Sequence, residues 1–282
     1  MPGTLFVVAT PIGNLEDITA RALRVLREAS MIAAEDTRRT AQLLARYAIT
    51  TPMTSLHEHN EAQKSASLIA RLERGDHVAL VSDAGTPTIS DPGQRLIRAA
   101  IDAGIKVESI PGPSAPIAAL SASGFSTDSF TFLGFPPIRS KARTEWFARI
   151  QKIGGTIIFF EAPHRVRRTL ANLKEAVGDC QVVVCREMTK AHEELVRGPI
   201  SSVLQRLKSE LGEFTIVIDI GHMTDHTPSE RPRDASLFSD FCELTKHRKL
   251  SRRKAVIALA RQHGMRPNEV YDLIESVKKS IE

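Results

Sequence analysis

Short apolar runs alternate with longer amphipathic segments along the first part of the chain. The runs are rich in β-branched residues and have the length of strands, whereas Ile18, Ala22 and Val25 fall on one face of a helical segment. The predicted strands are 4–9, 31–34, 77–82 and 106–110, and the predicted helices lie at about 16–29, 38–47, 61–73, 94–103 and 114–122. This alternation is typical of βαβ units, so the pattern predicts a parallel sheet covered by helices.

Polar residues and a glycine mark several of these helix ends. Asn14 is placed to cap the first predicted helix. Asn60 precedes the third predicted helix, and Gln63 has the spacing to reach back to it as in a capping box. Gly104 follows the fourth predicted helix, where a left-handed residue commonly ends a helix.

A second alternation follows residue 123, and a purely helical pattern ends the chain. The predicted strands here are 156–161, 181–186 and 214–220, and the predicted helices lie at about 141–153, 165–177 and 200–211. We therefore predict an α/β protein in three parts. They are an N-terminal α/β domain over 1–122 with a parallel sheet, a C-terminal mixed α/β domain over 123–224, and a linker with a small basic helical extension over 225–282.

The composition is that of an ordinary globular protein. Of 282 residues, 42% are apolar and 25% are charged. No apolar run reaches the roughly 18 residues that a membrane span requires, and the N-terminus lacks the basic region of a signal peptide. A cytoplasmic protein without a membrane partner is therefore expected. Cys180, Cys185 and Cys242 include no C-x-x-C pair, which favours reduced thiols over disulfides or a zinc site.

Positive charge is concentrated near the C-terminus. The formal net charge is +5, and residues 246–254 contain six Lys and Arg side chains and no acidic side chain. Such a run is either a solvated surface or a contact for an anionic partner, and composition alone favours neither interpretation.

Small and charged residues follow the predicted strands. In an open α/β sheet a ligand binds beyond the carboxyl ends of the strands, so a site is expected there. The segments are 10–14, 35–38, 83–93, 111–114, 162–165 and 187–190. Any one of them is well explained as a plain turn. Together they bring carboxylates, Arg, Lys and small residues to one rim, and 83–93 is longer than the roughly 2–6 residues of most βα loops.

Several common chemistries have no motif here. The chain has no G-x-G-x-x-G, no phosphate-binding loop of the G-x-x-x-x-G-K-[ST] type and no G-x-S-x-G. His192 and Glu193 begin an H-E-x-x-H pattern, but Val196 occupies the second histidine position. His57 and His59 are better explained as loop residues than as metal ligands, so no metal is expected.

Taken in order, these segments resemble the tetrapyrrole-methylase superfamily, and within it the cytidine 2′-O-ribose methyltransferases of small-subunit ribosomal RNA. The matching stretches are VATPIGNLEDIT (8–19), AAEDTR (33–38), ALVSDAGTPTISDPG (79–93), PGPSAPIAALSASG (111–124), FFEAPHR (159–165), REMTKAHEELVRG (186–198) and GEF (212–214). The series is far more specific than any single motif. The chain departs from the pattern with Thr88 for a usual Gly, Ala162 for a frequent Ser or Cys, and Met188 for a usual Leu.

The resemblance implies a homodimeric two-domain enzyme that binds S-adenosylmethionine between its domains. It implies methylation of the ribose 2′-hydroxyl of a cytidine in 16S ribosomal RNA, in the decoding region of the small ribosomal subunit. The cofactor contacts that it implies are Pro11, Ser82, Asp83, Ala84, Gly85, Ser114, Ala115, Phe160, Met188 and Thr215. Most are small residues, which suits a ligand that is held largely by backbone and has no phosphate.

Charged residues in the same segments are candidates for the chemistry. A ribose hydroxyl is a poor nucleophile, and Glu161, Glu187 or Asp36 could accept its proton. Lys190, desolvated near cations, could instead serve as a neutral base. The alternative is that these side chains form ion pairs that hold the domains together.

Lys and Arg side chains are the candidates for contact with RNA, because cations that meet backbone phosphates supply most of the affinity. They are Arg38, Arg165, Arg139, Lys141, Arg143, Arg248, Lys249, Arg252 and Arg253. Aromatic residues make up only 5% of the chain, so contacts to RNA shape and backbone are expected rather than extensive base stacking.

Two other functions compete with RNA methylation. A porphyrinoid C-methyltransferase would need the cleft but not the basic helical extension, so deletion of 236–282 would leave its activity intact. A non-catalytic RNA-binding protein that kept the fold would not bind S-adenosylmethionine.

Overall fold

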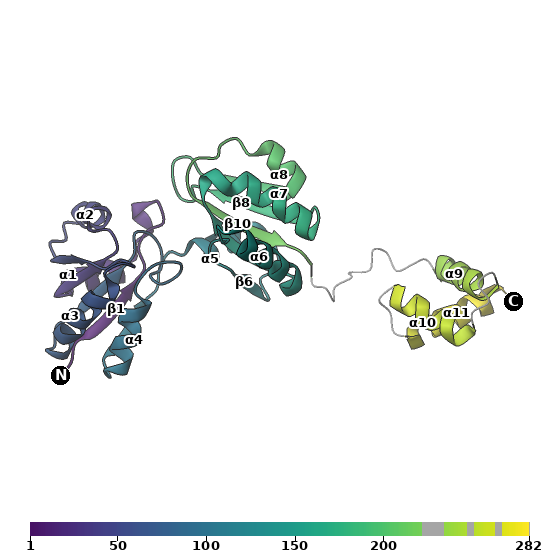
Figure 1. The fold of residues 1–282 in the computed structure, drawn as a ribbon, viewed down its shortest axis with the longest axis horizontal. Helices are drawn as coiled ribbons and strands as arrows, with labels where there is room; N and C mark the ends of the chain where they lie inside the picture. Colours follow the sequence, from purple (N-terminus) through teal and green to yellow (C-terminus); the bar gives the residue numbers. More distant parts are fainter. Residues whose placement is uncertain (222–233, 247–250, 263–266, 282) are drawn as a thin grey trace. The chain divides into compact units, whose positions relative to one another are not determined.

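The computed structural model describes residues 1–221, 234–246, 251–262 and 267–281. The chain forms two compact units, Met1–Ile220 and Gly221–Glu282, and each is described by itself. The first unit contains two five-stranded sheets with helices, which confirms the predicted α/β class (Figure 1). The division of this unit near residue 122 stays a prediction.

The first sheet is entirely parallel. Its strands are β1 (Thr4–Val8), β2 (Met31–Ala34), β3 (Met53–Ser55), β4 (Val78–Val81) and β5 (Lys106–Ile110), in the order β3-β2-β4-β1-β5. The four predicted strands are confirmed. Strand β3 was not predicted, because its three partly buried residues give no alternating pattern. The order places the carboxyl ends of all five strands at the same edge of the sheet.

Helices cover both faces of this sheet. They are α1 (Ala20–Glu28), α2 (Thr37–Arg46), α3 (Glu61–Glu73) and α4 (Gln94–Asp102). One buried cluster joins α1 and α2 to the sheet through Leu26 and Leu44, and another joins α3 and α4 through Leu68 and Leu96. Burial of both faces explains why the three inner strands, β1, β2 and β4, are almost continuously apolar.

The structure tests the three helix caps that the sequence predicted. Asn14 caps only a short 3₁₀ turn, η1 (Leu15–Asp17), and Thr19 caps α1 by accepting a 3.1 Å bond from the Ala22 amide, so the helix expected at about 16–29 is interrupted. The capping box at Asn60 is wrong, because its Oδ1 accepts from the His57 amide at 2.9 Å and makes no helix-capping bond. Gly104 does follow α4 in the left-handed region, at φ +67°.

The second sheet is mixed. Its strands are β6 (Phe130–Phe132), β7 (Thr156–Glu161), β8 (Gln181–Arg186), β9 (Glu194–Pro199) and β10 (Phe214–Asp219), in the order β6-β7-β10-β8-β9. Only β6 and β7 are parallel, and the other neighbours are antiparallel. The sequence pattern predicted β7, β8 and β10 but not β6 or β9, which are edge strands with mixed polar and apolar residues.

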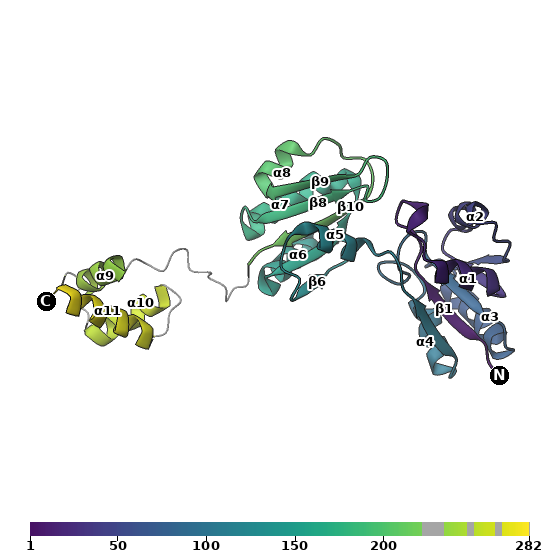
Figure 2. The same ribbon diagram turned by 180° about the vertical axis from the view of Figure 1, so that it is seen from behind.

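Helices also cover both faces of the second sheet. The helices α6 (Ser140–Ile153), α7 (Val166–Val177) and α8 (Ile200–Arg206) share one apolar cluster with it. The helix predicted at about 200–211 is shorter than expected, because α8 ends at Arg206. On the other face lies α5 (Ala115–Ser123), which packs against β7 and β10 (Figures 1 and 2). This helix follows the last strand of the first sheet but contributes its apolar residues to the second.

The C-terminal unit contains three helices in the part that the structure describes. They are α9 (Asp234–Lys246), α10 (Arg252–Gln262) and α11 (Pro267–Ile281), as the helical periodicity predicted. Leu237, Phe241, Leu259, Val270 and Ile274 form its apolar core. None of the described helices is long and apolar enough to cross a membrane.

We predict that Glu61→Ala destabilises the first unit by about 2 kcal/mol, because it leaves buried backbone donors without an acceptor. The Glu61 carboxylate, 7% exposed, accepts from the amides of Gly93 (3.1 Å), Arg95 (2.7 Å) and Leu96 (3.4 Å) at the start of α4. Chemical denaturation measures the effect. Glu73→Ala, at the exposed end of α3, is the control, and equal stability of the two variants would contradict the assigned role.

Candidate active site

The turns that follow the parallel strands are bonded to one another. Thr10, after β1, and Gly85, after β4, exchange backbone hydrogen bonds of 2.9 and 3.0 Å. The Thr86 hydroxyl donates to the Pro113 carbonyl at 3.1 Å, which attaches the turn after β5. The loops therefore form one connected rim at the carboxyl edge of the sheet, where the sequence predicted a site.

The loop after β4 contains residues in unusual backbone conformations. Thr88 and Ser90 have φ of 72° and 68°, in the region that side chains rarely adopt. The family pattern that the sequence resembles has Gly at position 88, which would adopt this φ without steric cost. Gly93, at φ +121°, ends the loop, and a Cβ there would lie 2.6 Å from Leu80 Cδ2. The loop shape is thus imposed by its surroundings and not by local preference.

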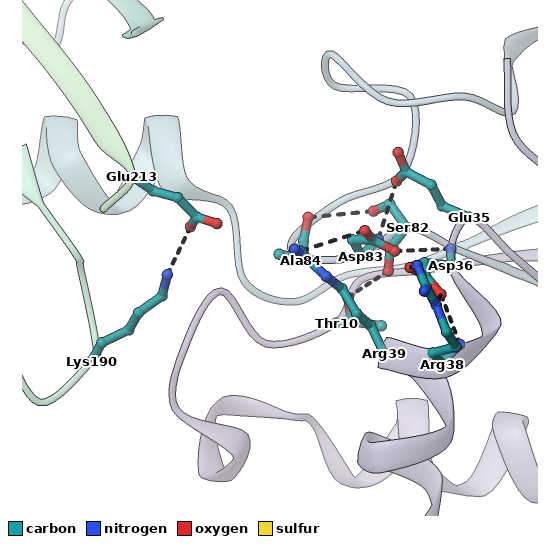
Figure 3. A network of polar contacts seen from close by, with 10 residues as sticks. All are labelled: Thr10, Glu35, Asp36, Arg38, Arg39, Ser82, Asp83, Ala84, Lys190 and Glu213. Carbon is teal, nitrogen blue, oxygen red and sulfur yellow. Dashed lines mark hydrogen bonds and ion pairs between the residues drawn. The ribbon is translucent and has the colours of Figure 1, made fainter. Parts of the chain in front are cut away.

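Carboxylates gather on this rim (Figure 3). Asp83 Oδ1 accepts from the Asp36 amide at 2.9 Å, and Glu35 Oε2 accepts from the Asp83 amide at 3.2 Å. Arg39 Nη1 lies 3.4 Å from Asp83 Oδ2. Burial raises the pKa of Glu35, and burial with the charges of Glu35 and Asp83 raises the pKa of Asp91 to about 6, against a hydrogen bond from Ser82 that lowers it. The rim therefore holds two carboxylates that are harder to ionise than usual.

Asp36 is in a different situation. Its carboxylate caps α2 by accepting from the Arg38 amide at 2.8 Å, and it accepts two further bonds from the Arg38 guanidinium, at 3.0 and 2.7 Å. These bonds hold the pKa of Asp36 well below its ordinary value. A carboxylate stabilised in its charged form is a weak base, so this geometry gives no support to the predicted role of Asp36 as a proton acceptor.

Glu161, at the end of β7, is a buried carboxylate with every oxygen engaged. Its Oε1 lies 2.6 Å from Arg165 Nη2 and accepts from the Ala162 amide at 2.7 Å. Its Oε2 accepts from the Thr169 hydroxyl and lies 4.0 Å from Arg143 Nη1. This is the ion-pair arrangement that the sequence left open as the alternative to catalysis.

Lys190 lies between two carboxylates. Its Nζ is 3.0 Å from Glu187 Oε1. The same atom is 3.0 Å from Glu213 Oε2, as Figure 3 shows. Burial lowers the pKa of Lys190, but its two glutamate partners outweigh this and the pKa is raised. The expectation that Lys190 lies among cations was therefore wrong, and its environment favours the protonated ammonium. Glu187 is stabilised as an anion, because its bonds to the Glu213 amide and Lys190 outweigh burial and lower its pKa.

The Lys190 segment touches the turn after β1. Thr189 Oγ1 accepts from the Asn14 amide at 2.9 Å. A Cβ on Gly13 would lie 2.5 Å from Lys190 Cγ and 2.9 Å from the Met188 carbonyl oxygen. Gly13 is therefore required by a close backbone approach and not by a turn.

Two adjoining pockets are lined by both sheets, with volumes of about 350 and 440 Å³. They share Ile12, Arg39, Asp83, Ala84 and Glu213. The predicted cofactor residues that line one or both are Pro11, Ser82, Asp83, Ala84, Gly85, Ser114, Ala115, Phe160 and Thr215. Met188 lines neither and packs instead in the apolar cluster beneath α5.

The sequence candidates omitted several residues that line these pockets, above all Glu35, Arg39, Asp91 and Glu213. Two signals were available. Glu35 stands in the AAEDTR stretch, and Asp91 stands in the unusually long loop after β4. Neither signal distinguishes a pocket carboxylate from a solvated one, which requires burial to be known.

A family model, described as Tetrapyrrole (Corrin/Porphyrin) Methylases, matches residues 4–204. Ribosomal RNA small subunit methyltransferase I of Pasteurella multocida (strain Pm70) is 41% identical over 278 residues, which are 96% of each chain. This chain belongs to the tetrapyrrole methylases, in the family of ribosomal RNA small subunit methyltransferase I.

Two further comparisons show which share of this methylase carries the family fold. The relative of the same name from Thermotoga maritima is 46% identical and is covered over 98% of its length, but it matches only 77% of this chain. A solved uroporphyrin-III C-methyltransferase from Thermus thermophilus, complexed with S-adenyl homocysteine, has a TM-score of 0.55 at 17% identity, over 77% of this chain and 98% of its own. Each of these two matches leaves about a quarter of this methylase uncovered.

The candidate RNA contacts of the methylase fall in three settings. Arg38, Arg139 and Lys141 are exposed, as is Arg252, which pairs with Glu275 at 3.5 Å. Arg143 and Arg165 are largely buried around Glu161. Arg248 and Lys249 lie outside the described residues, as does the side chain of Arg253. Their roles in RNA binding stay predictions.

Among the described residues of the methylase, no cluster of three or more His, Cys, Asp or Glu is arranged to hold a metal ion. His57 Nε2 lies 3.0 Å from Asn60 Nδ2, so this ring belongs to the loop that precedes α3. The three cysteines are free thiols.

We predict that Gly13→Ala weakens binding of S-adenosylmethionine on the order of tenfold. The added methyl would displace the 188–190 segment, and with it Lys190, which lines the smaller pocket beside Gly13. Isothermal titration calorimetry measures the affinity. Gly104→Ala is the control, because it introduces a strained left-handed alanine in open space away from the pockets. Equal affinity of the two variants would contradict the prediction.

Proposed function

We propose that this protein transfers the methyl group of S-adenosylmethionine to the ribose 2′-hydroxyl of a cytidine in 16S ribosomal RNA, in the decoding region of the small subunit. One observation carries the proposal. A pocket rich in carboxylates and apolar side chains lies where the strand ends of both sheets meet, in a chain whose full-length relatives are named ribosomal RNA small subunit methyltransferase I.

The larger pocket suits this cofactor in size and chemistry. Its volume of about 440 Å³ lies within the roughly 300–1,000 Å³ of small-molecule sites. Ile12, Ile89 and Phe160 offer apolar surface, and Ala84 and Gly85 allow close approach to backbone. The cofactor carries a sulfonium, an ammonium and a carboxylate, which leave it a net cation, and this wall provides the carboxylates of Glu35, Asp83, Asp91 and Glu213 against the single cation of Arg39.

The residues of the chain contribute mainly by positioning. When bound, S-adenosylmethionine supplies a methyl group that its sulfonium already activates for in-line displacement. The joined loops of the rim hold one reactant beside the other, which is the largest help that such a reaction needs. Transfer to a hydroxyl releases a proton. We assign its acceptance to Asp91, which lines the pocket and whose pKa, raised to about 6, makes it a stronger base than an ordinary aspartate.

The proton acceptor in this proposal is not one of the residues that the sequence analysis named for that role. The carboxylates of Glu161, Glu187 and Asp36 are each occupied by strong donors, and Lys190 is held as a cation. They remain candidates for positioning the substrate or the loops. Asp91, together with Glu35, takes the proton-accepting role in this proposal.

The protein would act in the cytoplasm as a homodimer on the assembled small subunit. The family resemblance supports the dimer, and the scarcity of aromatic residues supports recognition of a folded ribosomal surface. Because the Thermotoga maritima relative carries the same name without about a quarter of this chain, the C-terminal extension would add RNA affinity and not chemistry.

The fold family's description leaves a porphyrinoid C-methyltransferase as the second candidate. The decisive experiment incubates the protein with S-adenosylmethionine labelled in its methyl group and isolated unmethylated small subunits. We expect label on the 2′-oxygen of one cytidine of 16S RNA, which primer extension and nuclease mapping would locate. Subunits that already carry the methyl group are the control. In a parallel incubation a porphyrinoid replaces the subunits, and label on that compound with none on RNA would establish the rival activity.

We also predict that the affinity for S-adenosylmethionine rises about fivefold between pH 5 and pH 7. The pKa of Asp91 is about 6, so this group is neutral at the lower pH and anionic at the higher pH, where it attracts the cationic cofactor. Calorimetry across this range measures the effect. Asp91→Asn should lower the affinity at pH 7 and flatten the profile, whereas Asp102→Asn, at the exposed end of α4, should not. A profile that stays steep in Asp91→Asn would show that another group titrates.

A further inference from the structure

The helices α6 and α7 enclose a third pocket, with a volume of about 220 Å³. Ser140, Arg143, Thr144 and Phe147 recur on one face of α6, at helical spacing. Arg165, Arg168 and Asn172 recur in the same way along the start and first half of α7. Two helix faces therefore present polar and cationic side chains to a common space.

The charge of this pocket is strongly unbalanced. Its lining contains three guanidinium groups, from Arg143, Arg165 and Arg168, and no acidic side chain among the described residues. The carboxylate of Glu161 pairs with Arg165 at 2.6 Å and lies 4.0 Å from Arg143. One carboxylate cannot neutralise three cations, so the cluster keeps an excess of positive charge.

Burial makes this excess costly. Arg143 is only 9% exposed, and its Nη2 donates to the Thr169 hydroxyl at 2.6 Å. Its Nε and the Nε of Arg165 are both buried, and neither has a hydrogen-bond partner. Burial and the charges of Arg165 and Arg168 lower the pKa of Arg143, against the effect of Glu161. Buried cationic donors of this kind are normally paired, so they add to the cost of the cluster, and an anion in the pocket would offset its positive charge.

The pocket is connected to the proposed active site through one residue. Glu161 lines the larger of the two site pockets, and its two arginine partners line the basic pocket. An anion bound among the arginines would therefore lie near the substrate whose methylation is proposed above. A polynucleotide is the anionic substrate that this arrangement suits, because its phosphates recur along the strand on either side of the reacting ribose.

We propose that the basic pocket between α6 and α7 binds a backbone phosphate of the RNA substrate beside the methylated nucleotide. The guanidinium groups of Arg143, Arg165 and Arg168 provide the charge. The hydroxyls of Ser140 and Thr144 and the amide of Asn172 provide further donors. The identity of the occupant as RNA rests on the proposed function, whereas the capacity of the pocket for an anion does not.

The test uses the full-length protein and replaces the exposed member of the cluster. Arg168→Ala removes a pocket charge without breaking the contacts of the buried Glu161. Arg149→Ala, an exposed arginine of α6 that does not line the pocket, is the matched control with the same change in net charge. Circular dichroism melting would check that both variants remain folded.

Two measurements separate the pocket from its occupant. Line broadening of inorganic phosphate in ³¹P NMR, at constant ionic strength, should be seen with the unaltered protein and with Arg149→Ala, and should largely disappear with Arg168→Ala. Affinity for isolated small subunits should fall about tenfold in Arg168→Ala alone, with the slope of log affinity against log salt reduced by about 1. Calorimetric affinity for S-adenosylmethionine should be unchanged in both variants.

Phosphate broadening that is equal in the two variants, or absent from the unaltered protein, would overturn the anion pocket. Phosphate binding that depends on Arg168, with equal small-subunit affinity in both variants, would overturn the assignment to the RNA backbone. Failure of the unaltered protein to methylate small subunits would instead contradict the proposed function, and it is read in a separate assay.

Discussion

The burial of the Glu161 carboxylate is the constraint on which the second half of the first unit depends. A charge with no solvent exposure is tolerated only when donors surround it, and here they come from Arg165, Arg143, Thr169 and the Ala162 amide. Arg143 belongs to α6, whereas Arg165 and Thr169 belong to the turn before α7 and to α7 itself. One carboxylate at the end of β7 thus ties both helices to the sheet and sets the space between them.

This arrangement separates charge in a way that suits the two reactants. Carboxylates line the larger site pocket, where a cationic methyl donor is proposed to bind. Arginines line the neighbouring pocket, where an anionic polynucleotide is proposed to bind. Glu161 belongs to the first group and neutralises part of the second, so it acts as the boundary between them.

Periodicity was a reliable guide where elements are buried on both faces. The strands at 31–34, 156–161 and 181–186 have the predicted bounds, because continuous apolar runs leave little freedom in register. It failed for β3, β6 and β9, which lie at sheet edges and have a neighbour on one side only, whereas the fourth edge strand, β5, was predicted with the observed bounds. Capping signals were less reliable, since Asn60 bonds to His57 and Thr19 interrupts the first helix. A short polar side chain can bond to any of several nearby backbone groups with similar energy, and the rest of the fold decides which partner it has.

The site, like the fold, was predicted from the sequence only in part. The loops that form the rim could be found from the sequence, because the carboxyl ends of parallel strands must meet at one edge. The chemistry of individual side chains could not. Lys190 was expected among cations and lies between Glu187 and Glu213, while Asp91 was not singled out although it is the carboxylate with a pKa near neutrality.

The sequence by itself determined the α/β class, the family and the segments that form the rim, because these depend on local periodicity and on motifs read in order. Only the tertiary structure decided which charged groups are paired, which are desolvated and which share a pocket. Glu161 and Arg143 are 18 positions apart, and Gly13 and Lys190 are 177 apart, yet each pair is in or near contact. Electrostatic energy depends on distance and burial in space, and neither quantity is written in the order of residues along the chain.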